Sequence, residues 1–202
     1  GWVNSHQEAA GIRQELKASG LVLETMTEDI FDTIWENRPS LPKTPVFILD
    51  ETRTGASCTE KIGRIQEAIE KNGASAIILS ALDEIAWTLN LRGNDVHCNP
   101  VFISYLLISK EGYTLYILED KITDEVRQYL NLHHVEIKSY SALAEDLRTF
   151  KENHQGILQI SPLANEALYD LSAQYADTIV QASPVALMKA VKNETEQAGF
   201  RK

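Results

Sequence analysis

The sequence has 202 residues, of which 44% are hydrophobic and 24% are charged, and this composition is typical of globular proteins rather than disordered ones. Its formal net charge of −10 and its lack of a lysine- or arginine-rich stripe argue against nucleic acid as a partner, since phosphate binding needs clustered positive charge. The longest apolar runs, residues 75–82 and 101–108, are far shorter than the roughly 20 residues needed to cross a bilayer, so no membrane is expected.

Two cysteines, Cys58 and Cys98, are too few for a disulfide framework, and they predict a reducing, cytoplasmic location. A single bridge between them stays an alternative. The first residues, Gly1 to Asn4, have neither the basic region nor the apolar region of a signal peptide, and we interpret them as internal to a longer polypeptide.

Residues 1–53 are predicted to form the end of a preceding domain and a connector. Apolar residues at helical spacing predict a first helix that Gly20 ends, and residues 28–35 predict a second short helix. Residues 38–45 hold three prolines, which fix φ and remove amide donors. We therefore expect an extended connector there, with a domain boundary near it.

Residues 54–182 alternate between helical and strand patterns. Strands are predicted at residues 75–80, 101–109, 113–118, 135–137, 157–160 and 178–180. Helices are predicted from Ser57 to Asn72, from Leu82 to Leu89, from Thr123 to Leu130, from Ser141 to Phe150 and from Asn165 to Tyr175. Residues 110–112 indicate an antiparallel hairpin, so the fold class is α/β with a mixed sheet flanked by helices.

A last helix is predicted from Val185 to about Ala198, because Ser183 and Pro184 form a strong helix start. Its second half is polar, and the sequence offers no later element for it to pack against. We interpret residues 183–202 as the first helix leading to a further domain.

Catalytic motifs are missing from the sequence: it has no GxSxG, P-loop, GxGxxG, CxxC or HExxH pattern. The five histidines are scattered, and adjacent His133 and His134 point to opposite faces if they lie on a strand. Acidic pairs such as Asp83 with Glu84 are more typical of solvated helix faces, or of first turns where they complement the helix dipole, than of an acid/base couple. No catalytic residue and no metal ligand is predicted in this chain.

One dense polar cluster lies between a predicted helix and a predicted strand, at residues 90–100. Its candidates for contact with a substrate or a neighbouring domain are Arg92, Asn90, Asp95, His97 and Asn99. Arg92 is the leading one, because a guanidinium binds a carboxylate bidentately. The favoured alternative is structural: Asn94, Asp95 and Asn99 bond to nearby backbone amides, and Gly93 supplies a positive φ.

The residues of this cluster also carry a family resemblance. Residues 81–105, ALDEIAWTLNLRGNDVHCNPVFISY, closely resemble a stretch in the middle domain of three-domain Xaa-Pro aminopeptidases of the cytosolic aminopeptidase P type. Residues 34–39, IWENRP, and 188–196, MKAVKNETE, resemble that family's connector and the start of its catalytic domain. The resemblance covers essentially the whole chain.

The resemblance implies a creatinase N-terminal-like (RNase H-like) fold for residues 54–182 and a non-catalytic role for the chain. The missing catalytic domain would hold two divalent metal ions, manganese in most members, so that no cofactor is expected in this fragment. The implied partners are that catalytic domain, a second copy in a homodimer, and a peptide with proline at its second position. The alternatives are a binding or scaffold module of a degenerate relative, and part of a prolidase or creatinase.

Overall fold

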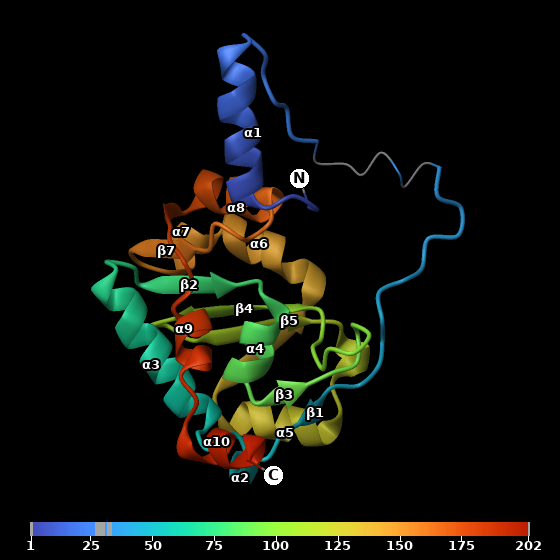
Figure 1. The fold of residues 1–202 in the computed structure, drawn as a ribbon, viewed down its shortest axis with the longest axis vertical. Coiled ribbons are helices and arrows are strands. Elements are labelled where there is room, and N and C mark those ends of the chain that lie inside the picture. Colours follow the sequence, from blue (N-terminus) through green and yellow to red (C-terminus); the bar gives the residue numbers. More distant parts are fainter. Residues whose placement is uncertain (1, 27–30, 32–33, 202) are drawn as a thin grey trace.

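The computed structural model describes residues 2–26, 31 and 34–201. Within these residues a six-stranded mixed sheet carries helices on both faces, which confirms the predicted α/β fold (Figure 1). The strand order is β6-β5-β4-β2-β7-β8. The strands are β2 (Ala76–Leu79), β4 (Ser104–Ser109), β5 (Tyr113–Ile117), β6 (Val135–Ser139), β7 (Ile157–Ile160) and β8 (Asp177–Val180).

The predicted hairpin is present, since β4 and β5 pair antiparallel with Ile108 opposite Tyr113. Strand β2 also pairs antiparallel with β4, but it is parallel to β7 on its other side. The remaining pairs, β5 with β6 and β7 with β8, are parallel. The mixed sheet therefore has an antiparallel centre and parallel flanks.

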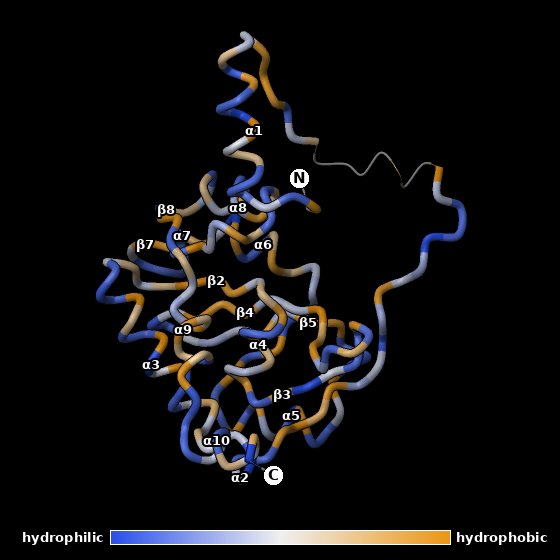
Figure 2. The backbone as a smooth tube through the Cα atoms, viewed as in Figure 1, coloured by the Kyte–Doolittle hydropathy of each residue, from blue (hydrophilic) through white to orange (hydrophobic). Residues whose placement is uncertain are grey.

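Alternation along the strands divides the core into two layers. In β2, Ile77 and Leu79 face one layer, and Ala76 and Ile78 face the other. The first layer lies under α3 (Cys58–Lys71), α4 (Leu82–Thr88), α5 (Asp124–Leu132) and α9 (Pro184–Ala190). The second lies under α6 (Leu143–Arg148), α7 (Phe150–Asn153) and α8 (Glu166–Tyr175). Figure 2 shows the apolar segments running through the strands at the centre.

Side-chain caps start several helices as the sequence predicts. The Ser57 hydroxyl accepts from the Glu60 amide at 3.1 Å, and Thr123 and Asn165 begin α5 and α8 in the same way. The helix predicted from Ser141 differs, because a 3-10 turn, η3 (Tyr140–Ala142), precedes α6 and leaves it without a side-chain cap. The Ser141 hydroxyl instead contacts that of Ser139.

The single helix predicted from Val185 to Ala198 was wrong. The chain forms α9 and then α10 (Glu194–Phe200), with extended backbone at Val191 between them. Asn193 and Glu196 form a capping box that starts a new helix there. The side-chain amide of Asn193 also donates to the Thr54 carbonyl at 2.7 Å. The segment packs against earlier elements of the chain, since Val185 is buried and α9 contacts α3 and α4.

Helix α1 (His6–Ala18) confirms the first predicted helix and projects from α8 (Figure 1). The His6 ring stacks on Tyr169, and its Nδ1 atom lies 2.7 Å from the buried Glu166 carboxylate. The predicted helix at residues 28–35 lies largely outside the described residues. No helix in the described part of the chain is long and apolar enough to span a bilayer.

The connector ends in structure that the sequence analysis did not predict. Strand β1 (Phe47–Ile48) pairs antiparallel with β3 (Leu91–Arg92), and α2 (Glu51–Thr54) follows it. The Val46 amide donates to the carbonyl of Lys121, which ends the short 3-10 helix η2 (Glu119–Lys121). The connector therefore lies against the polar cluster of residues 90–100.

Candidate functional site

The polar cluster begins with a residue that belongs to the core. Asn90 is fully buried and has a positive φ of 53°. Its Oδ1 atom accepts from Lys61 Nζ at 2.5 Å, and its Nδ2 atom donates to the Ala56 carbonyl at 2.9 Å. Because both ends of its amide are used inside the protein, Asn90 is placed to hold the fold together rather than to bind a ligand.

Arg92 lies half-buried on β3 at the edge of a groove. Its Nη1 atom donates to the carbonyls of Ala86 and Leu91, both at 2.8 Å. Burial lowers the pKa of the guanidinium, and the nearby Glu196 carboxylate opposes that shift. Of the five predicted site residues, Arg92 is the one that brings a charge to the groove.

Asp95 and Lys121 form an ion pair in which both side chains are 0% exposed. The other Asp95 oxygen accepts from the Ile103 amide at 2.7 Å, and Lys121 Nζ donates to the Pro42 carbonyl at 3.3 Å. Asp95 therefore joins the cluster to the connector and to the start of β4. Its predicted role as a local turn residue understates these contacts.

The second half of the cluster is exposed. His97, Cys98 and Asn99 all lie at the surface, and Asn99 lines the groove. A bridge between Val96 and Asn99 closes a turn in which Cys98 has a positive φ of 60°. The described contacts give the Asn99 side chain no local amide to accept from, unlike the predicted turn role.

Gly93 does not supply the positive φ that the sequence analysis expected; Asn90 and Cys98 do so instead. The need for glycine is steric, because a Cβ atom at residue 93 would lie 2.7 Å from the Phe102 Cβ atom and 3.0 Å from the Val101 carbonyl oxygen. Both positions are too close for a carbon atom, so the loop and the following strand pack directly on the Gly93 backbone.

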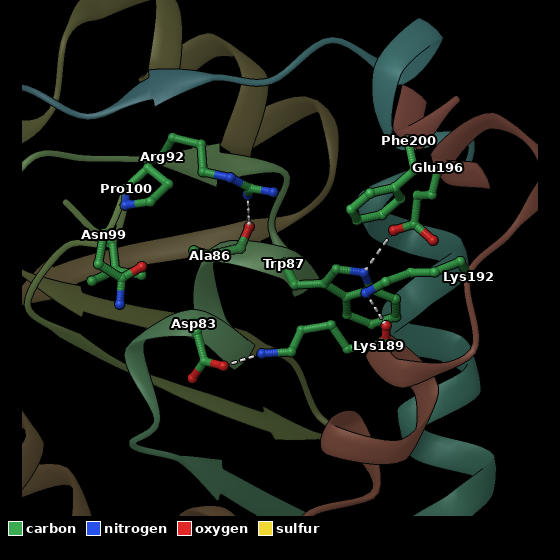
Figure 3. A pocket seen from close by; sticks show the side chains of 11 residues that line it. Asp83, Ala86, Trp87, Arg92, Asn99, Pro100, Lys189, Lys192, Glu196 and Phe200 are labelled. Carbon is green, nitrogen blue, oxygen red and sulfur yellow. Dashed lines mark hydrogen bonds and ion pairs between the residues drawn. The ribbon is translucent and has the colours of Figure 1, made fainter. Parts of the chain in front are cut away.

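The groove beside this loop has a volume of ≈ 280 Å³ and is shown in Figure 3. It is lined from α4 by Asp83, Ala86 and Trp87, from β3 and the loop after it by Arg92, Asn99, Pro100 and Val101, and from α9, α10 and the residues between them by Lys189, Lys192, Glu196 and Phe200. Ion pairing joins Lys189 to Asp83, and the Trp87 indole N–H donates to Glu196 Oε1 at 3.3 Å. These contacts hold the C-terminal segment against α4.

The groove has charged and aromatic groups, but its residues form no nucleophile and base pair. Asp83 is ion-paired, and burial raises the pKa of the adjacent Glu84. Both residues lie in the first turn of α4, as the sequence analysis expected. Among the described residues, no three His, Cys, Asp or Glu side chains are grouped so that they could hold a metal ion. The arrangement is suited to binding and to holding segments together.

Cys58 and Cys98 are both free thiols, so the alternative of a bridge between them is not realised. Burial raises the pKa of the Cys58 thiol to about 12, which makes it a poor nucleophile. Cys98 is exposed on the turn.

Two buried lysines, Lys61 and Lys121, were missed by the sequence analysis. Lys61 is 1% exposed and its Nζ atom lies 4.4 Å from the centre of the Trp87 ring. A signal for it was present: Cys58, Lys61, Ile62, Ile65 and Ile69 share the buried stripe of α3. Lys121 follows a strand in a short polar run, and the sequence offers no comparable signal for its burial.

Comparison with known proteins finds several similar to this chain. Residues 37–196 match the family model described as the creatinase/prolidase N-terminal domain. A protein named probable Xaa-Pro aminopeptidase P, from Sordaria macrospora, is 39% identical over 92% of this chain and 32% of its own length. A protein named Xaa-Pro aminopeptidase 1, from Dictyostelium discoideum, is 38% identical over 82% of the chain and 26% of its own length. The chain thus spans about a third or less of these relatives.

Two solved structures have a similar fold. An X-prolyl aminopeptidase from Caenorhabditis elegans, described as a cytosolic enzyme with a di-nuclear active site, matches 98% of this chain and 33% of its own with a TM-score of 0.90 and 25% identity. A Xaa-Pro dipeptidase from Bacillus anthracis matches 70% of this chain and 38% of its own with a TM-score of 0.55 and 19% identity.

Proposed function

The chain belongs to the creatinase/prolidase N-terminal domain family, and on this premise we propose that it is a non-catalytic domain of a metal-dependent Xaa-Pro aminopeptidase. The supporting observation is the similarity, along nearly the whole chain, to relatives that carry this name and are about three times as long. The proposed reaction is hydrolysis of the peptide bond between the first residue and a proline at the second position.

The chemistry of the proposed reaction is assigned to a part of the protein outside this chain. The described residues do not fit a metal centre, because no suitable group of ligands is brought together. We propose two divalent ions, manganese in the first instance, in a following catalytic domain. Such ions activate a water molecule and polarise the scissile carbonyl when bound.

The proposed layout keeps residues 1–53 as the end of a preceding domain with its connector, residues 54–182 as the middle domain, and residues 183–202 as the link to the catalytic domain. The groove beside Arg92 supports this layout, since α9 and α10 line it together with α4 and the polar cluster. We propose that the domain supports the catalytic domain and limits access to the reaction site. Arg92 and Asn99 are the predicted site residues that line the groove, and they remain candidates for that contact.

A prolidase or creatinase is the weaker assignment. The dipeptidase structure matches a smaller part of this chain, with a lower TM-score, than the aminopeptidase structure does. A scaffold module with a degenerate catalytic domain is the other rival. The sequence of the proposed catalytic domain in the full-length protein separates the scaffold module from an active aminopeptidase. A complete two-metal ligand set there supports the active enzyme, and an incomplete set supports the scaffold.

We further propose a cytoplasmic location and a homodimer for the whole protein. The location is supported by the similar enzyme described as cytosolic and by the two free cysteines. Light scattering of the purified full-length protein tests the dimer: a mass of two chains supports it, and a mass of one chain contradicts it.

The test of the proposed activity compares two proteins and two peptides. The full-length protein with manganese should release the first residue from a peptide with proline second, and far less from the same peptide with alanine second. A chelator should abolish this release, and added manganese should restore it. The 202-residue chain alone should release nothing. Chelator-sensitive release by the chain alone, or no proline-dependent release by the full-length protein, would contradict the proposal.

A further inference from the structure

Lys61 is a buried cation whose hydrogen-bond acceptors are neutral. Its Nζ atom donates to the Trp87 carbonyl at 2.9 Å and to Asn90 Oδ1 at 2.5 Å. The same atom lies 4.4 Å from the centre of the Trp87 ring, a distance typical of a cation–π contact. The charge is thus held by α3 and directed onto the indole of α4.

The indole also contacts the C-terminal segment. Trp87 Nε1 donates to Glu196 Oε1 at 3.3 Å, and Figure 3 shows the Glu196 carboxylate reaching toward the indole from α10. The other carboxylate oxygen of Glu196, Oε2, accepts from the backbone N–H of Asn193 at 2.9 Å, as part of the capping box that starts α10. One aromatic ring therefore joins a buried cation to the carboxylate at the start of α10.

We propose that Lys61 is a positioning residue for α10: its positive charge on the Trp87 ring keeps the indole N–H directed at Glu196, and loss of its proton releases α10 from the domain. A cation on the ring favours a carboxylate at the indole N–H, because both contacts are electrostatic and the Trp87 ring between the two charges is buried. Docking of α10 in this way does not depend on peptidase activity.

The charges around Lys61 support such a switch near neutral pH. Burial lowers the pKa of Lys61 to about 8, and Glu196 raises it against that shift. Of the other groups, Arg92 on β3 lowers this pKa, while Cys58 and Glu60 on α3 raise it.

The sign of the effect follows from reciprocity. Because docked Glu196 raises the pKa of Lys61, protonated Lys61 must favour the docking of Glu196 by the same free energy. This stabilisation of α10 is complete below the pKa of Lys61 in the undocked state. It is lost as the pH rises through about 8, the pKa of Lys61 in the docked state.

The experiment uses Trp87 as its own reporter. Trp2 and Trp35 are exposed, so Trp2→Phe and Trp35→Phe leave a single-tryptophan chain with the fold intact. We expect the fluorescence of Trp87 to change with a midpoint near pH 8. Glu196→Gln should lower the midpoint, Lys61→Met should abolish the change, and Lys71→Met, at an exposed lysine of the same helix, should leave it unaltered.

Amide hydrogen exchange then reports on α10 directly. After correction for the intrinsic pH dependence, exchange in residues 194–200 should rise across the same midpoint, by roughly tenfold for each pH unit by which Glu196 raises the pKa of Lys61. Lys61→Arg keeps its charge throughout this range, so it should keep α10 protected even if Lys61→Met fails to fold. Two results would overturn the proposal. One is a pH midpoint of Trp87 fluorescence that Glu196→Gln does not shift, and the other is amide exchange in α10 that does not rise at that midpoint.

Discussion

The two halves of the cluster at residues 90–100 both carry polar side chains, but in opposite environments. In the first half, Asn90 and Asp95 are joined to buried lysines, and Arg92 donates to two carbonyls. In the second half, His97 and Asn99 lie at the surface. A run of polar residues beside a strand can thus pass from the core to the surface within ten positions.

The comparison predicts a large cost for breaking the first half. Asp95→Ala should lower the free energy of unfolding by about 3–5 kcal/mol, because it leaves Lys121 charged, buried and without its carboxylate. Urea unfolding measures this. Asp83→Ala is the matched control, since it removes a half-exposed carboxylate paired with Lys189 and should cost no more than about 1 kcal/mol. Equal losses in the two variants would contradict the distinction.

The close packing at Gly93 predicts the next largest effect. Gly93→Ala should lower the free energy of unfolding by about 1–3 kcal/mol, because its Cβ atom meets Phe102 and the Val101 carbonyl. Gly112→Ala places a methyl group where no atom lies within 4 Å, and it should change stability little. Thermal unfolding of both variants compares them, and a similar melting temperature in the two would show that the loop moves to accept the methyl group.

Lys61 predicts a pH dependence of global stability. Because its pKa falls from 10.5 to about 8 on folding, the unfolded chain binds more protons than the folded chain between these values. Stability should therefore rise with pH in this window, by up to about 1.4 kcal/mol per pH unit relative to Lys61→Met. Global stability and α10 docking should thus respond to pH with opposite signs. Urea unfolding at pH 7.5, 9 and 10 checks this, and parallel curves for the two proteins would contradict it.

The smallest effects are expected at the exposed half. Cys98→Gly should raise the free energy of unfolding by at most about 1 kcal/mol, because glycine tolerates its positive φ. His97→Ala should change it by less than about 0.5 kcal/mol. Asn90→Gly also relieves a positive φ, yet it should be destabilising, since Lys61 loses one of its two acceptors and the Ala56 carbonyl loses a donor. Chemical unfolding of the three variants ranks them.

Much of the fold could be predicted from the sequence because local chemistry and the fold agree. Ser57 and Thr123 are good helix caps whatever surrounds them, and the apolar runs that form β2 and β4 can only be buried. The break between α9 and α10 was not predicted, because residues 190–198 contain no proline or glycine that would end a helix. The contact of Asn193 with Thr54 favours the break, and that contact exists only in the folded chain.

The candidate site was predicted less well than the fold. The sequence places Arg92 in a polar loop, but the groove also needs Trp87 from α4 and Glu196 from α10, which only the fold brings together. Asn90 and Asp95 are polar residues in a loop, which predicts a binding site, but in the structure their side chains pair with buried lysines. Residue type alone does not distinguish a side chain that receives a ligand from one that satisfies a buried charge.

The mixed sheet joins strands that lie close together in the chain and strands that lie far apart. The hairpin of β4 and β5 joins neighbours in the chain, whereas β2 and β7 pair Ala76 with Leu158 and must enclose everything between them. Because long loops close at a greater entropic cost, we expect the hairpin to form first and the β7 and β8 edge to assemble last. Pulse-labelled amides in β5 should gain protection before those in β7, so a growing chain would keep this last edge open until its second half has left the ribosome.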